Sequence, residues 1–323
     1  MEYKVVVTDS KGRTFPTHPK YPELKFILLN GLNESNLNIL SDADALIVDQ
    51  VEITKEIIGK LDKCKVIVRM GIGYENVDLD ACKNKGIILC NIPDFCIDEV
   101  SDHVLAMFFA IGRGIVEYMD KLKNLDWSVK TRTPIRRIKN LTFGILGMGA
   151  TGSSLALKLK NICNNICFYD PFLRRGFEKS YNVKRVESLD ELLKVSDVLS
   201  IHVPLTKETL YMVNKEFLLK MKKNAIIINT SRGKIIRLDD LYWALKENII
   251  YGACLDVFED EPINFEHKLF KAWLNQEEWI KNRLILTPHV AYYSIESEKE
   301  LQEKAVEEVY RVLSGQKPLN RIV

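Results

Sequence analysis

The amino-acid sequence predicts an α/β protein with two doubly wound parallel sheets. The chain of 323 residues corresponds to about two domains of ordinary size. Short runs rich in β-branched residues alternate with stretches of helical periodicity, once before and once after a long helical stretch. Parallel strands need crossover connections, which are usually helices, so this double alternation predicts two parallel sheets.

Five strand-like runs predict the first sheet, and they are residues 3–8, 26–29, 45–48, 66–69 and 87–90. From residue 98 to 125 apolar residues recur every three to four positions, which predicts one long helix between the domains. The polar, basic stretch 124–140 that follows predicts a solvated loop.

Six further runs predict the second sheet, and they are residues 142–146, 166–170, 198–202, 225–229, 252–256 and 284–287. The stretch 153–162 behind the first of them has helical character. Residues 295–313 predict a last, amphipathic helix, and we expect the tail 315–323 to pack back on the first domain.

The composition excludes several classes of protein. Hydrophobic residues make up 46% and charged residues 28%, as in ordinary globular chains. The net charge of +2 is too small for a protein that binds chiefly to phosphates, so we expect no nucleic-acid partner. The longest apolar run, residues 104–111, is far shorter than the roughly 20 residues of a membrane span, so we expect no membrane segment.

The seven cysteines predict reduced thiols in the core. Their number is odd and the sequence has no Cys-x-x-Cys pair, although a redox or metal-binding role remains the alternative. The N-terminal sequence lacks the pattern of a secretory signal. We therefore expect a cytoplasmic protein.

A glycine-rich turn predicts a dinucleotide site. Gly147, Gly149 and Gly152 follow the strand 142–146 and precede a helical run. In this context the first glycine permits a tight turn, the second lets the backbone approach a pyrophosphate, and the third lets helix and strand pack closely. The intervening Ala150 and Thr151 belong to the same phosphate-binding turn.

Asp170 indicates which dinucleotide is bound. It ends the strand 166–170, where an acidic side chain accepts hydrogen bonds from the adenosine ribose. A 2′-phosphate would be repelled there, so we expect NAD rather than NADP. Arg174 and Arg175 lie close by and weaken this preference.

Polar residues at later strand ends predict the chemistry. Arg232, Glu261 and His289 each follow a strand-like run. In a parallel sheet, ligands bind beyond the carboxyl ends of the strands. An arginine, a carboxylate and a histidine are the groups needed to hold an anionic substrate and to move its proton.

Six motifs resemble the family of D-isomer-specific 2-hydroxyacid dehydrogenases. They are residues 69–78, the glycine turn, and residues 202–206, 229–233, 255–262 and 287–294. The segment 289–294, with an aromatic residue at Tyr292, is similar to the C-terminal binding protein and D-lactate dehydrogenase branches.

The resemblance implies a role for each matching residue. It implies that His289 is the acid/base, Glu261 its hydrogen-bonded partner and Arg232 the clamp on the substrate. The substrate's carboxylate would also meet the backbone of Gly71, Ile72 and Gly73, with Tyr292 in the pocket, and these residues would bind substrate. Asp256 would approach the nicotinamide carboxamide and Pro204 would line the adenine site.

Each of three further polar residues has two interpretations. Arg69 is either a charge on the substrate side or an ion-pair partner at a strand end. His202 is interpreted as a strand-end or adenine-side residue rather than a second base, and His103 as structural or at an interface. No metal is required, because Arg232 and His289 already supply the charge stabilisation.

The resemblance also implies an organisation and a function. We expect a discontinuous, flavodoxin-like substrate domain, residues 1–98 and 294–323, with a Rossmann-type NAD domain, residues 99–293, inserted in it. The expected reaction is reversible hydride transfer between NAD(H) and a D-2-hydroxy acid or 2-oxo acid. We expect a homodimer formed through the NAD domain. The alternative is an NAD(H)-responsive scaffold, similar to a corepressor, whose partners matter more than turnover.

Overall fold

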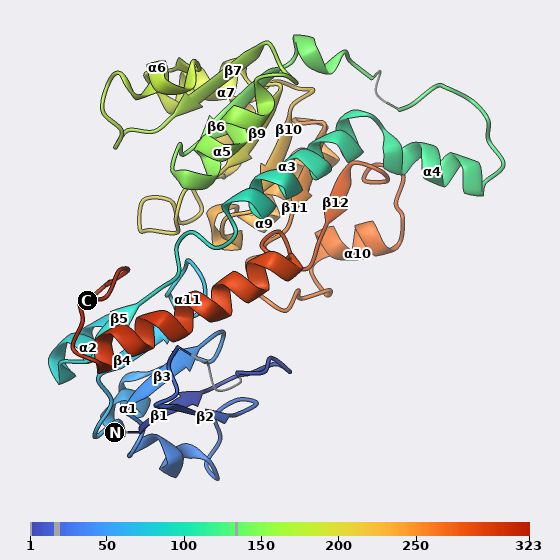
Figure 1. Cartoon of the computed structure of the whole chain (residues 1–323). Coiled ribbons are helices and arrows are strands. Elements are labelled where there is room, and N and C mark those ends of the chain that lie inside the picture. The colour runs from blue at the N-terminus through green and yellow to red at the C-terminus, as the bar shows by residue number, and fades with distance from the viewer. Residues whose placement is uncertain (1, 16–19, 133–134) are drawn as a thin grey trace. The chain divides into compact units, whose positions relative to one another are not determined.

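The computed structural model describes residues 2–15, 20–132 and 135–323, so residues 133–134 of the expected loop lie outside the described residues. The chain divides into two compact units, Met1–Phe95 with Ser294–Val323, and Cys96–Tyr293. One unit holds a five-stranded parallel sheet and the other a seven-stranded parallel sheet (Figure 1). The predicted fold class is confirmed.

The sheet of the first unit has the flavodoxin-like strand order β2-β1-β3-β4-β5. Its strands are β1 (Tyr3–Val7), β2 (Leu24–Leu28), β3 (Ala45–Val48), β4 (Val66–Arg69) and β5 (Ile88–Cys90). Its helices are η1 (Leu37–Leu40), α1 (Lys55–Gly59), α2 (Leu79–Lys85) and α11 (Ile295–Leu313). The strands match the predicted runs to within two residues, and α11 has the predicted bounds.

The chain end packs on the first unit, as expected. Ser294 and Ser297 form a capping box that starts α11, and Leu301, Ala305 and Val309 form its buried stripe. Beyond the helix, the tail forms an antiparallel bridge with β5, in which the Ile322 N–H donates to the Leu89 carbonyl at 2.8 Å. The tail thereby covers the outer edge of β5.

The sheet of the second unit has the order β12-β11-β10-β9-β6-β7-β8, which is the Rossmann order extended by one strand. Its strands are β6 (Thr142–Leu146), β7 (Asn165–Tyr169), β8 (Lys184–Arg185), β9 (Val198–Ile201), β10 (Ile226–Asn229), β11 (Gly252–Leu255) and β12 (Leu284–Leu286). Its helices are α3 (Ile97–Gly112), α4 (Ile115–Lys123), η2 (Ile138–Asn140), α5 (Ala150–Leu159), α6 (Phe177–Tyr181), α7 (Leu189–Val195), α8 (Lys215–Leu219), η3 (Gly233–Ile235), α9 (Leu238–Lys246) and α10 (Lys268–Leu274).

Helices cover both faces of this second sheet. Apolar side chains of α3 and α5 form one core with alternate strand residues such as Ile226 and Ile228. The intervening residue Ile227 joins the other core, which includes side chains of α7, α8 and α9. A strand buried on both faces is apolar along its whole length, which explains the continuous runs in the sequence.

The predicted long helix 98–125 is wrong in one respect, because it is two helices. α3 ends at Gly112 and α4 begins at Ile115. Between them Gly114 has φ +63°, a left-handed conformation that breaks the helix and that glycine adopts without strain. The periodicity continues across the break, so the apolar pattern did not reveal it. The predicted helix 153–162 is α5, which begins three residues earlier at Ala150.

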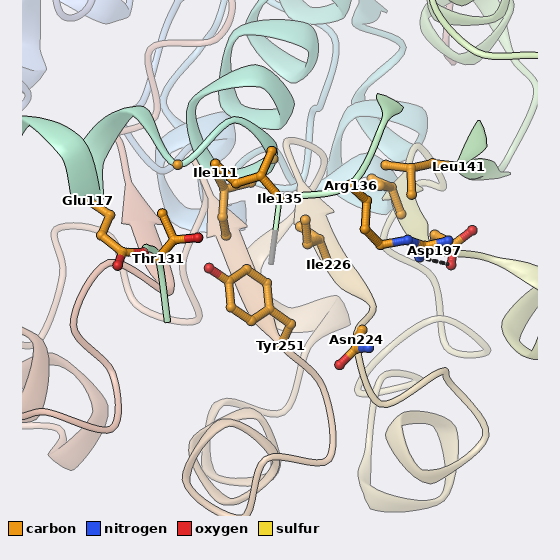
Figure 2. Close-up of a pocket in the computed structure, with 13 residues that line it drawn as sticks. Ile111, Glu117, Thr131, Ile135, Arg136, Leu141, Asp197, Asn224, Ile226 and Tyr251 are labelled. Atoms are coloured by element: carbon orange, nitrogen blue, oxygen red, sulfur yellow. Dashed lines mark hydrogen bonds and ion pairs between the residues drawn. The ribbon is translucent and has the colours of Figure 1, made fainter. Parts of the chain in front are cut away.

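A pocket in the second unit lies at the amino ends of its strands (Figure 2). Ile111, Ile135 and Ile226 supply apolar walls, and Arg136 pairs with Asp197 at 2.7 Å on its rim. In a parallel α/β sheet the chemistry is found at the opposite, carboxyl ends of the strands. This pocket is therefore separate from the candidate site described below.

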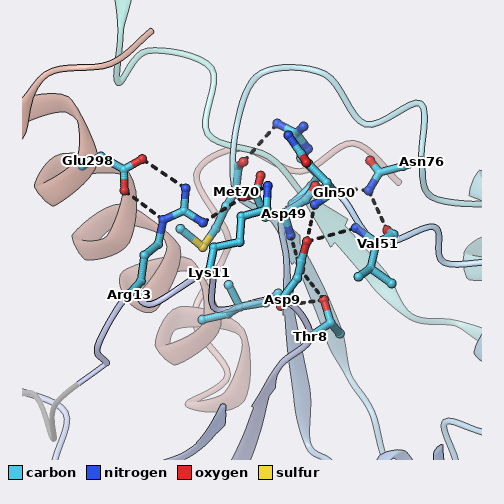
Figure 3. Close-up of polar contacts among 12 residues, drawn as sticks. Thr8, Asp9, Lys11, Arg13, Asp49, Gln50, Val51, Met70, Asn76 and Glu298 are labelled. Atoms are coloured by element: carbon cyan, nitrogen blue, oxygen red, sulfur yellow. Dashed lines mark hydrogen bonds and ion pairs between the residues drawn. The ribbon is translucent and has the colours of Figure 1, made fainter. Parts of the chain in front are cut away.

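Charged side chains gather at the carboxyl ends of β1 and β3 in the first unit (Figure 3). The buried Asp9 carboxylate accepts three bonds, at 2.9, 2.5 and 3.0 Å, from the backbone N–H groups of residues 49–51. Arg13 donates to Asp49 at 2.8 Å and to Glu298 of α11 at 2.8 and 3.1 Å. Arg13 therefore ties α11 to the loop that follows β3.

The pKa of the Asp49 carboxyl lies below its usual value. Burial raises this pKa, but the hydrogen bond and charge of Arg13, together with the charge of Lys11, lower it by more. A carboxyl whose pKa is depressed by folding stabilises the folded state above its unfolded pKa of about 3.9. That contribution is lost as the pH falls through the folded pKa.

Replacement of this carboxylate should reveal the effect. Asp49→Asn should lower the free energy of unfolding at pH 7 by about 1–3 kcal/mol, because Arg13 loses a charged partner. Urea denaturation should show that this difference shrinks as the pH falls below about 4. Asp42→Asn is the control, because Asp42 is an exposed partner of Lys4 and such pairs contribute little. A difference that is the same at pH 7 and pH 3 would contradict the prediction.

Candidate active site

The glycine turn joins β6 to α5, and its three glycines meet different surroundings. Gly147 has φ +89°, and a Cβ there would lie 2.9 Å from the His202 backbone. A Cβ at Gly152 would lie 2.3 Å from the Gly147 carbonyl oxygen. At Gly149 a Cβ would meet nothing within 4 Å. Packing within the chain therefore requires the outer two glycines, while the space at Gly149 is open to a ligand.

The helix behind the turn suits a phosphate. Gly149 is the N-cap of α5, and Ala150 and Thr151 are the first residues of the helix. The first N–H groups of a helix have no partner inside it, and the helix dipole favours an anion at this end. The open space and these donors together fit a dinucleotide pyrophosphate.

Asp170 directly follows β7 and lies against the glycine turn. Its carboxylate accepts the Met148 N–H at 2.9 Å and the Phe172 N–H at 3.0 Å. An ionised carboxylate has about four acceptor positions, so it retains capacity for ribose hydroxyls. Both nearby arginines are exposed, and Arg175 pairs with Glu187 at 3.0 Å.

Arg232 lies on a turn that Asn229 shapes. Asn229 ends β10 and is fully buried. Its Oδ1 accepts the Ser231 N–H at 3.0 Å, and its Nδ2 donates to the Arg232 carbonyl at 3.0 Å. The next residue, Gly233, packs so closely that a Cβ would lie 1.9 Å from the Phe258 backbone. The loop that carries Arg232 is therefore in contact with the loop that carries Glu261.

Glu261 and His289 form a hydrogen-bonded pair. Glu261 Oε2 lies 2.6 Å from His289 Nδ1, and Oε1 accepts the Phe258 N–H at 2.9 Å. Burial raises the pKa of Glu261, but the His289 hydrogen bond and charge, the Phe258 N–H and the charge of Arg232 lower it by more. Because an ionised carboxylate only accepts, the proton lies on Nδ1 and leaves Nε2 for a reacting group.

The backbone at His289 is held in an unusual conformation. His289 has φ +53°, which is uncommon for a residue other than glycine. Its N–H donates to the Asp256 carbonyl at 2.8 Å. The buried Asp256 carboxylate also accepts the Val290 N–H at 3.0 Å and the Ala291 N–H at 2.9 Å. The Tyr292 ring lies edge-on to the His289 ring, with centroids 6.4 Å apart.

The remaining cofactor-side residues lie at the end of β9. Pro204 is exposed, and its carbonyl accepts the Thr209 hydroxyl at 2.6 Å. His202 Nε2 lies 2.8 Å from the Ser200 hydroxyl, and burial lowers the pKa of His202 to about 4. A neutral histidine bonded to its own strand fits the interpretation of His202 as a strand-end residue.

The predicted glycines of the first unit follow β4. Gly71 has φ +139°, and a Cβ there would lie 1.6 Å from an Arg69 guanidinium nitrogen. The same nitrogen donates to the Met70 carbonyl at 3.0 Å, and Asn91 donates to the Ile72 carbonyl at 2.7 Å. The positive φ therefore favours glycine at position 71, and the Arg69 guanidinium group lies in the space beside it.

Sequence reasoning missed the side chains that hold these loops. Asn229 appeared only as part of a motif, although Asn followed closely by Ser after a strand is typical of a turn that an amide side chain closes. Glu259 accepts the Leu238 N–H at 2.8 Å and so joins the Glu261 loop to the start of α9. The sequence carries no signal for that bond, because its partners are 21 residues apart.

The described residues contain neither a metal-binding cluster nor a membrane-spanning helix. No group of three or more His, Cys, Asp or Glu side chains could hold a metal ion in residues 2–15, 20–132 and 135–323. No helix among the residues that the structure describes is long and apolar enough to cross a membrane.

The fold and the site define a class of protein. A Rossmann-type unit with a glycine turn, an acidic residue after the next strand and a carboxylate–histidine pair at the strand ends is typical of nucleotide-dependent dehydrogenases. Residues 105–291 match the family model described as "D-isomer specific 2-hydroxyacid dehydrogenase, NAD binding domain". The chain belongs to this family of NAD-dependent oxidoreductases.

Individual relatives agree with this assignment. The chain is 34% identical over 287 residues to a glyoxylate reductase of Korarchaeum cryptofilum. The aligned region covers 88% of this chain and 83% of that relative. The chain is also 34% identical over 284 residues, 88% of this chain, to a D-3-phosphoglycerate dehydrogenase of Methanocaldococcus jannaschii, but spans only 52% of that relative. A D-lactate dehydrogenase from Aquifex aeolicus, solved with NAD and lactic acid, has a TM-score of 0.85 and 32% identity, with 99% of each chain covered. The predicted family, enzyme class and cofactor NAD are confirmed.

The surroundings of two glycines give a testable contrast. Gly233→Ala should lower the free energy of unfolding by roughly 1–3 kcal/mol, because the new methyl group meets the Phe258 backbone. Gly149→Ala should leave the unfolding of the free protein nearly unchanged and weaken NADH binding, because it fills only the open space. Urea denaturation and NADH fluorescence titration measure the two effects. Equal loss of stability in both variants would show that Gly149 also serves packing.

Proposed function

We propose that this protein transfers a hydride reversibly between NAD(H) and a D-2-hydroxy acid, giving the 2-oxo acid. The observation that carries the proposal is the Glu261–His289 pair at 2.6 Å, at the same strand ends as Arg232 and in the unit that carries the glycine turn. The His289 and Glu261 side chains are 41% and 35% exposed, so a substrate can reach them. Bound NAD supplies the hydride acceptor, and reduced NADH supplies the hydride donor.

His289 moves the proton in this proposal. Its Nδ1–H bond to Glu261 fixes the tautomer, so Nε2 accepts the hydroxyl proton while the Cα–H hydride leaves the substrate. The product is the 2-oxo acid, and the proton then resides on the imidazole. Glu261, whose pKa is lowered, stays ionised and stabilises the imidazolium. Reduction reverses these steps.

Other residues hold the substrate and cofactor. Arg232 offers a planar, permanently charged fork to the substrate carboxylate. We also assign substrate binding to Tyr292 and to the backbone of residues 71–73. We assign residues 1–98 and 294–323 to substrate binding and residues 99–293 to NAD binding. In the NAD site the glycine turn would take the pyrophosphate, Asp170 the ribose, Pro204 the adenine side and Asp256 the nicotinamide side.

We also propose that the protein is a homodimer formed through the NAD-binding unit. α4 has no buried residue, and beyond it Leu125 and Trp127 are 94% and 89% exposed. Several charges on this segment are paired within the chain, for example Asp120 with Lys281 and Arg132 with Glu278. Exposed apolar groups mark an interaction surface, and charges that are paired within the chain do not repel a second copy that approaches with the same surface, as in a symmetric dimer.

The buried thiols support a proposal for the cellular compartment. Buried free thiols are found at six positions, which are Cys64, Cys82, Cys90, Cys163, Cys167 and Cys254. Six free thiols in one chain are typical of a reducing compartment, and we propose the cytoplasm.

Turnover of 2-oxo acids tests the proposed reaction. NADH oxidation should be measured with glyoxylate, pyruvate and a phosphorylated 2-oxo acid, because these acids share the 2-oxo acid group and differ in their side chains. His289→Ala should lower kcat by roughly 10²–10⁴-fold, the usual effect of a positioned acid/base, while the Kd of NADH stays within about twofold. If the wild type binds NADH but reduces none of the acids, the scaffold alternative gains support instead.

The oligomeric state tests the proposed interface. Sedimentation should give a dimer for the wild type, and replacement of both Leu125 and Trp127 by Ser should shift it toward the monomer. Leu319→Ser is the matched control, because Leu319 is 63% exposed but lies in the other unit. A dimer that tolerates the double replacement would place the interface elsewhere.

A further inference from the structure

His103 on α3 reaches the turn that carries His289. His103 Nε2 lies 2.9 Å from the Thr287 hydroxyl and 3.7 Å from Asp256 Oδ1. The Thr287 hydroxyl in turn donates to Asp256 Oδ1 at 2.5 Å. All three residues belong to the same compact unit. A side chain of the long helix α3 thus contacts the candidate active-site turn.

The direction of each hydrogen bond follows from the chemistry of the groups. An ionised carboxylate only accepts, so the single hydroxyl proton of Thr287 is donated to Asp256. The Thr287 oxygen then acts as the acceptor for His103, which must carry its proton on Nε2. The result is a directed chain from His103 through Thr287 to Asp256.

Asp256 connects this hydrogen-bonded chain to the backbone of the turn that carries His289. Its side chain is only 1% exposed, and its two oxygens accept the Val290 and Ala291 N–H groups. Its backbone carbonyl accepts the His289 N–H at 2.8 Å. These bonds flank the one residue of the turn with a positive φ, His289 at +53°, a conformation that persists only when its surroundings enforce it.

We propose that His103 is a positioning residue, which holds the imidazole of His289 in place through Thr287 and Asp256. The proposal rests on the proposed function only for its effect on catalysis. Its structural part concerns residues 287–291 alone. His103 touches neither His289 nor Glu261 in any hydrogen bond described above, so its effect on turnover has to pass through the turn.

Substitutions at both ends of the chain test the proposal. His103→Phe keeps a ring and loses the donor, and it should lower kcat about 10-fold with the Kd of NADH within about twofold, because a misplaced acid/base slows chemistry more than binding. His103→Gln keeps an N–H donor at similar reach and should stay within about threefold of the wild type. Thr287→Val should resemble His103→Phe, and the double variant should be no slower than the slower single variant.

Hydrogen exchange supplies a readout that does not need turnover. In His103→Phe the Val290 and Ala291 amides should exchange at least about 10-fold faster than in the wild type. Asp102→Asn is the matched control, because Asp102 lies beside His103 on α3 but pairs with Lys158, and it should change neither exchange nor kcat.

Each outcome decides a separate point. Unchanged exchange in His103→Phe would overturn the proposal, as would faster exchange with an unchanged kcat. Equal losses of kcat in His103→Phe and His103→Gln would also overturn it, because they would show a packing role instead of a hydrogen-bonded one. A wild type that reduces no 2-oxo acid would refute the proposed function, and exchange alone would then decide whether His103 holds the turn.

Discussion

The turns after parallel strands carry backbone N–H groups that burial would leave without partners, and short polar side chains at strand ends satisfy them. Asp9 binds three N–H groups of residues 49–51, Asn229 binds both sides of the Arg232 turn, and Asp256 binds the turn of His289. An unsatisfied buried N–H costs about 1–3 kcal/mol, so each of these side chains selects one conformation of its turn. The rest of the candidate site depends on this selection.

The reactive side chains thereby differ from the supporting side chains in their exposure to solvent. Asp256 and Asn229 are fully buried, whereas Glu261 and His289 remain partly exposed. The buried groups fix the backbone, and the exposed pair is left with its own 2.6 Å hydrogen bond. This division lets His289 keep a strained backbone and still offer one ring nitrogen to a ligand.

The glycines illustrate why one residue type serves different purposes. Gly147, Gly152 and Gly233 are required by neighbouring backbone atoms of the chain itself, since a Cβ at each would lie under 3 Å from them. Gly149 alone in the nucleotide turn meets nothing. The spacing of the turn indicates a dinucleotide site, but only the surroundings distinguish the packing glycines from the one that faces a ligand.

The sequence by itself determined the class of fold, because runs of β-branched residues and helical periods report directly on which faces are buried. It also predicted Arg232, Glu261 and His289 as residues at strand ends, since strand ends are visible where an apolar run stops. The break at Gly114 and the pairing of Glu261 with His289 were decided by the tertiary structure. The tertiary structure also decided the hydrogen-bonded chain from His103 through Thr287 to Asp256. His103 lies 153 residues before Asp256 in the sequence, and Thr287 lies 31 residues after it. Hydrophobic periodicity reports which residues of one element share a face. These contacts depend instead on the distance between separate elements, and tertiary packing alone sets that distance.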